Sequence, residues 1–158
     1  MILFFRALTR VFILGFAYFV ACVAAVLTLV ISIVGWRADY GGFDASTPEE
    51  MLALILSSAI GLVSFWHIFA AALPAVTIAA LITEAFSWRS VFVHVMAGGV
   101  IGLFILNESG LYEGETPPSQ ELIITLASGF VAGFVYWLIA GRRAGSWRVM
   151  PKAALPEA

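Results

Sequence analysis

The chain of 158 residues is 62% hydrophobic and only 11% charged, and its mean hydropathy is +1.02. A typical soluble domain is about 45–50% apolar and about 25% charged, so most of this chain belongs in lipid, and disordered, collagen-like and disulfide-scaffold proteins are excluded. The formal charge of −2 gives no basic surplus for nucleic acid, and the single cysteine, Cys22, can form neither an internal disulfide nor a thiolate metal site.

Four apolar stretches are long enough to cross a hydrocarbon core of about 30 Å, which takes about 20 helical residues. They predict transmembrane helices over residues 11–35, 51–83, 88–106 and 120–140. The first stretch is much longer than the core of a signal peptide, so we expect it to remain as a span. The expected fold is therefore an all-α integral membrane protein, an antiparallel four-transmembrane-helix bundle of residues 1–145 with a short basic cytoplasmic tail, residues 146–158.

The second stretch is too long to cross a bilayer as a straight helix. Pro74 is the expected position of a bend, because proline removes one backbone donor and clashes with the carbonyl of Ala70. The segment Thr47-Pro48-Glu49-Glu50 predicts the start of this helix, with Thr47 as N-cap, proline at the first helical position and Glu50 completing a capping box.

The charges orient the predicted spans. Seven of the eight basic residues, but only two of the ten acidic residues, lie on the side of the two termini. By the positive-inside rule this side faces the cytoplasm, so both termini are expected there. The basic residues concerned are Arg6 and Arg10 before the first span, Arg89 between the second and third, and Arg142, Arg143, Arg148 and Lys152 after the fourth.

Small residues recur four positions apart on every span, the spacing that lets helices approach closely in lipid. The simplest interpretation is that these stripes are the packing faces of the bundle. The alternative is that one of them binds a partner or a second copy. The residues are Ser57 and Gly61 in the second span, Gly98 and Gly102 in the third, and Gly129 and Gly133 in the fourth.

Polar residues gather at the cytoplasmic ends of the last three spans. His94 shares a face with Gly98 on the third span, and Tyr136 shares the glycine face of the fourth, so we expect a hydrogen bond between these two side chains. Glu84 and Arg89 lie beside them at the turn between spans two and three. The favoured interpretation is a structural network with an interfacial Glu84–Arg89 salt bridge; the alternative is an inward-facing ion or proton site.

His67 lies near the middle of the second span, an unusual depth for an ionisable residue. Its candidate roles are a proton relay, a contact to a substrate, or an axial haem ligand with His94. The two histidines differ in depth by about 9 Å at helical rise, which is too much for one iron. We therefore expect no cofactor and no metal.

The chain carries five motifs in its last three spans: Leu73-Pro74-Ala75, Glu84-Ala85-Phe86, Arg89-Ser90, Ala97-Gly98-Gly99 and, most extensive, Ala132-Gly133-Phe134-Val135-Tyr136-Trp137-Leu138-Ile139-Ala140-Gly141-Arg142. With these motifs it resembles small four-span inner-membrane proteins of alphaproteobacteria that carry no assigned activity. The resemblance covers about half of the chain and implies a location in the bacterial inner membrane. It brings no catalytic residue.

No nucleotide-binding glycine loop, catalytic triad or metal-spaced cluster occurs in the sequence. We therefore expect a protein without enzymatic activity, an accessory or interaction subunit that acts through its helices. Its expected partners are the lipid bilayer and either a larger membrane complex or a second copy of itself, and not nucleic acid. The alternative is a small homo-oligomeric transporter or channel that uses His67 and the Glu84, His94 and Tyr136 cluster.

Overall fold

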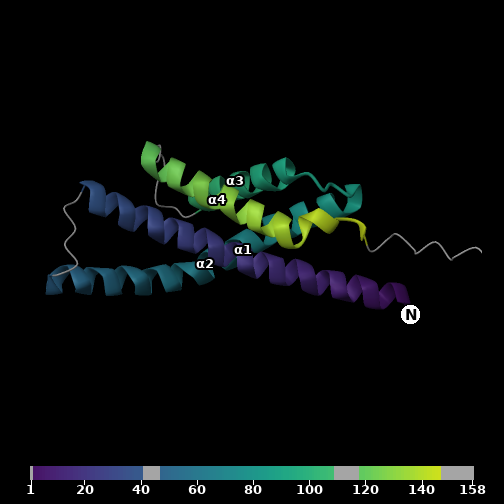
Figure 1. The fold of residues 1–158 in the computed structure, drawn as a ribbon, viewed down its shortest axis with the longest axis horizontal. Helices are drawn as coiled ribbons and strands as arrows, with labels where there is room; N and C mark the ends of the chain where they lie inside the picture. The colour runs from purple at the N-terminus through teal and green to yellow at the C-terminus, as the bar shows by residue number, and fades with distance from the viewer. Residues whose placement is uncertain (1, 41–46, 109–117, 147–158) are drawn as a thin grey trace, which may run out of the picture.

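The computed structural model describes residues 2–40, 47–108 and 118–146, except for the side chains at positions 2, 3, 33–40, 53, 54, 57–62 and 64. In these ranges the chain forms helices and no strand (Figure 1). The elements are α1 (Ile2–Tyr40), α2 (Pro48–Phe86), α3 (Val91–Glu108), α4 (Ser119–Ile139) and a short 3₁₀ helix, η1 (Gly141–Arg143).

Each α-helix contains a segment long and apolar enough to cross a membrane, so the prediction of an all-helical protein with four such helices is confirmed for the described residues. The segments are Phe4–Ser32, Phe65–Phe86, Val91–Glu108 and Ser119–Ile139. The largest side chains face outward, as in a protein solvated by lipid: Phe12 is 81% exposed and Phe92 is 72% exposed.

The helix boundaries differ from the predicted spans, most of all at the start of α1. Helix α1 begins at Ile2 rather than near residue 11, because the preceding segment contains no proline or glycine to interrupt it, so that Arg10 lies within the helix. Helix α2 ends where Ser87 adopts a left-handed backbone with φ of 54°, and α3 then begins at Val91 rather than at residue 88. At the start of α2, Pro48 takes the predicted first position, although the Thr47 side chain forms no cap hydrogen bond.

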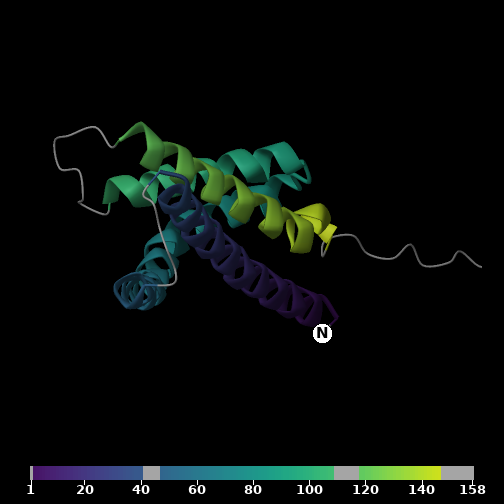
Figure 2. The same cartoon turned by 60° about the vertical axis from the view of Figure 1, so that its left-hand side comes forward.

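Helix α2 runs unbroken through Pro74, but its axis changes direction. In Figure 2 its first part is seen nearly end-on, whereas its later part crosses the view. Near this bend the Tyr18 hydroxyl of α1 donates a hydrogen bond to the carbonyl oxygen of Phe69, and the two rings lie 4.7 Å apart. Helix α1 therefore contacts α2 just before the proline.

Helices α3 and α4 pack most closely, through glycines that allow backbone contact. A Cβ atom at Gly129 would lie 2.5 Å from the carbonyl oxygen of Gly98, and one at Gly98 would lie 2.9 Å from the Cα of Gly133. A Cβ at Gly102 would lie 3.1 Å from the carbonyl oxygen of Thr125. Helix α1 lies along α4, whereas α2 touches α1 and α3 more sparsely. The side chains at positions 57 and 61 lie outside the described residues.

Candidate functional site

A buried ion pair joins α1 to the end of α2. Arg10 and Glu84 are only 6% and 8% exposed. Arg10 Nε donates to Glu84 Oε1 over 2.8 Å, and Nη2 of the same guanidinium donates to the same oxygen. A charge in an apolar environment is costly unless it is paired, so each of these residues requires the other.

The same pair also binds the end of α4. Arg10 Nη2 donates to the carbonyl oxygen of Ala140 over 2.7 Å, and the backbone N–H of Gly145 donates to Glu84 Oε2 over 2.8 Å. The guanidinium thus lies at the negative end of the α4 dipole, which adds to its stabilisation. We call these four residues, Arg10, Glu84, Ala140 and Gly145, the polar clamp. It links three helices at one end of the molecule.

The turn between α2 and α3 is fastened to the segment after α4 by two further hydrogen bonds. Arg89 Nε donates to the carbonyl oxygen of Ala144 over 3.1 Å, and Trp137 Nε1 donates to the carbonyl oxygen of Arg89 over 2.7 Å. The predicted salt bridge between Glu84 and Arg89 is therefore wrong. Glu84 pairs with Arg10 instead, because α1 brings Arg10 beside it. The sequence around Arg10 contains no glycine or proline, and this feature could have indicated that Arg10 lies inside the first helix.

His94 and Tyr136 lie together, as their faces predicted, but their rings stack at 5.9 Å with an interplanar angle of 25°. Within the described residues His94 Nε2 and Tyr136 Oη have no hydrogen-bond partner, so the hydrogen bond predicted between these side chains is wrong. His94 Nδ1 lies 2.9 Å from the carbonyl oxygen of Ser90. Since a carbonyl only accepts, this contact assigns the proton of the neutral ring to Nδ1 and the lone pair to Nε2.

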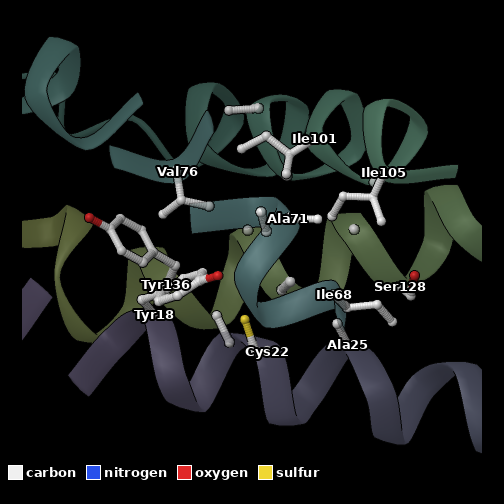
Figure 3. A pocket seen from close by; sticks show the side chains of 18 of the residues that line it. Tyr18, Cys22, Ala25, Ile68, Ala71, Val76, Ile101, Ile105, Ser128 and Tyr136 are labelled. Carbon is white, nitrogen blue, oxygen red and sulfur yellow. The ribbon is translucent and has the colours of Figure 1, made fainter. Parts of the chain in front are cut away.

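A cavity of about 530 Å³ extends between the four helices (Figure 3). Tyr18 and Cys22 line it from α1, and the sulfur of Cys22 points into it. On α3 the lining runs from His94 to Glu108, which corresponds to about 21 Å at 1.5 Å per residue. The cavity is therefore long, and one end of it adjoins the polar clamp, since Thr83 and Tyr136 also line it.

The cavity walls are largely small and apolar. Alanines from all four helices line it, and their short side chains leave space between the helices. Glu108, at the end of α3, is the only formally charged residue among the described residues that line it. The alanines that line it are Ala21, Ala25, Ala71, Ala72, Ala79, Ala80, Ala97 and Ala132.

The predicted site residues divide between these two features. Glu84 belongs to the polar clamp, whereas His94 and Tyr136 lie between the clamp and the cavity. His67 lines the cavity farther from the clamp and is otherwise exposed. Sequence reasoning missed Arg10 and Tyr18, whose partners come from another helix. Among the described residues no three His, Cys, Asp or Glu side chains are grouped so that they could hold a metal ion.

Comparisons of this chain with models of protein families, with curated proteins and with solved structures find no match.

Proposed function

We propose that this protein is a non-enzymatic integral membrane protein that holds one long, apolar molecule between its helices. The observation that carries the proposal is the cavity of about 530 Å³ lined by all four helices. Small-molecule sites in proteins occupy about 300–1,000 Å³ and are lined mainly by apolar groups. Walls of alanine, valine and isoleucine offer few partners to water, so a hydrocarbon chain suits this space better.

The shape of the cavity limits the occupant. A lining of about 21 Å along α3 matches an extended chain rather than a compact ring system. Membrane lipid is the natural source of such molecules, and α2, which bends away from its neighbours, leaves the bundle sparsely closed on that side (Figures 1 and 2).

The setting that we propose is an antiparallel four-helix bundle in a bacterial inner membrane, with both termini in the cytoplasm. The basic residues of the described chain support this orientation. Arg6, Arg89 and Arg142 lie at the end of the molecule that holds the polar clamp, whereas Glu108 and Glu121 lie at the opposite end. The polar clamp is then on the cytoplasmic side.

The test is to identify what travels with the protein. Protein extracted from its own membrane in mild detergent is analysed by native mass spectrometry, and bound molecules are extracted and identified. The variant Ala71→Phe, which fills the cavity, should lose the bound molecule. Ala70→Phe is the matched control, because Ala70 is the preceding residue on the same helix and is exposed. Equal retention by both variants, or no bound molecule in any sample, would overturn the proposal.

A protein of this kind can serve as an accessory subunit that presents its ligand to a larger membrane complex, or it can associate with a second copy of itself. The same native mass measurement distinguishes these roles. A larger protein that accompanies the chain in fixed stoichiometry supports the accessory role, and a bare homo-oligomer contradicts it.

A small transporter is the second candidate, because one cavity reaches both His67 and His94. This role requires movement of a solute across the bilayer. It predicts ligand flux in proteoliposomes that His67→Ala reduces; binding without flux would exclude it.

A further inference from the structure

We propose that the molecule held in the cavity is a single-chain amphiphile with a cationic head group, and that its head lies at Glu108. This inference rests on the proposed function, since it names the class of ligand for the same cavity. It follows from the chemistry of the two ends of the cavity.

At the end beside the polar clamp, no described residue that lines the cavity carries a formal charge. The guanidinium of Arg10 donates to Glu84 and to the carbonyl oxygen of Ala140, and the second carboxylate oxygen of Glu84 accepts from Gly145. The clamp residues are buried, and their charges balance each other. An ionic head group placed there would have to displace a buried pair, at considerable cost.

The opposite end carries an exposed carboxylate. Glu108 lines the cavity at the last position of α3, where the helix dipole is negative and therefore unfavourable for a carboxylate. The other described acids at this end lie in the first turns of their helices, Glu49 and Glu50 in α2 and Glu121 in α4, where the dipole favours them. A cation is therefore stabilised most at Glu108, where it is attracted both by the carboxylate and by the negative end of the α3 dipole.

The shape of the cavity determines where the hydrocarbon chain of the ligand lies. A head group at Glu108 directs its chain along α3 toward His94, over about 21 Å. The chain would pass the wall that contains Cys22, whose sulfur points into the cavity (Figure 3). Because Cys22 is the only cysteine of the chain, its alkylation reports on whether the cavity is filled.

The experiment uses the full chain in nanodiscs of digalactosyl diacylglycerol, an uncharged lipid without an ammonium group. Dodecyltrimethylammonium, dodecanol and dodecanoate, which share one chain length, are added below micellar concentrations. The rate of alkylation of Cys22 by N-ethylmaleimide is followed by intact mass, and native mass spectrometry counts the bound chains. The ammonium compound should protect Cys22 at up to about fivefold lower concentration than the alcohol, the upper end of the effect of one exposed ion pair.

The substitution Glu108→Gln should remove this preference and leave protection by the alcohol unchanged. Glu121→Gln is the matched control, since this acid lies at the same end but does not line the cavity. If the three compounds protect and bind equally, the cationic head group is wrong and the apolar site stands. If none of them protects or binds, the proposed function itself fails.

A parallel sample in which part of the lipid is replaced by ethanolamine phospholipid, with no compound added, identifies the source of the cation. Protection that depends on Glu108 in this sample would assign the site to a two-chain lipid whose ammonium binds Glu108, and it would overturn the single-chain ligand. If this sample shows no protection and the added ammonium compound does protect Cys22, the result supports the single-chain cation.

Discussion

The Nε atom of Arg10 donates to Oε1 of Glu84 over 2.8 Å, although the two residues are 74 positions apart in the chain. The pair holds the first helix against the end of the second, and its further bonds to Ala140 and Gly145 add the end of the fourth. A single buried ion pair therefore links three helices. Its removal should affect the whole bundle rather than one contact.

Glu84→Gln should strongly destabilise the protein. The substitution leaves the Arg10 guanidinium buried without its counter-charge, and breaking such a pair costs about 3–5 kcal/mol. The measurement is the free energy of unfolding in detergent micelles, followed by helix content against increasing denaturing detergent. Replacing both partners, as Arg10→Met with Glu84→Leu, should recover a large part of the loss. Exposed Glu121→Gln serves as the control; an equal effect at both positions would show that the pair adds nothing.

Gly98→Ala should destabilise the contact between α3 and α4. The added methyl group would lie 2.9 Å from the Cα of Gly133, a backbone atom that cannot rotate away, and overpacking of this kind costs about 1–3 kcal/mol. Gly15→Ala is the matched control, because its methyl group would have no neighbour within 4 Å and alanine favours the helix. The same unfolding assay should show a loss for Gly98→Ala and none for Gly15→Ala. A harmless Gly98→Ala would mean that the two backbones are not in contact.

Tyr18→Phe should lower the free energy of unfolding by about 0.6 kcal/mol and by no more than about 1.7 kcal/mol, the range for hydrogen bonds between membrane helices. The substitution removes the hydroxyl that donates to Phe69 and keeps the ring contact. Tyr136→Phe provides the contrast, because its hydroxyl is buried without a partner in the described residues and its removal should cost nothing. A larger loss of unfolding free energy for Tyr136→Phe than for Tyr18→Phe would contradict this prediction.

Gly145→Ala should weaken the polar clamp. Gly145 has a φ of 72°, which costs about 1–2 kcal/mol for a residue with a Cβ, and the added atom would meet the Ser87 side chain. Its N–H would then move away from Glu84. Ser87→Gly should have the opposite effect, because Ser87 itself has a positive φ of 54°. Thermal unfolding in detergent measures both, and similar melting temperatures for the two variants would contradict the prediction.

Much of the fold could be predicted from local properties of the sequence. Four apolar stretches predicted the four helices of the described chain that are long and apolar enough to cross a membrane, since the hydropathy of each stretch does not depend on its neighbours. Pro48 marked the start of α2, because proline suits the first helical position. Spacing by four also grouped Gly129 and Gly133 on one helix face, which the structure places against α3.

The partners of the polar residues were decided only by the tertiary structure. Sequence reasoning paired Glu84 with its neighbour Arg89 and placed a hydrogen bond between His94 and Tyr136; the structure pairs Glu84 with Arg10 and stacks the two rings. The cavity likewise depends on how the four helices come together, since all four line it. Helices in lipid associate through the fit of whole faces, without a hydrophobic force toward one arrangement, so a pattern within one helix does not reveal which residue of another helix it meets.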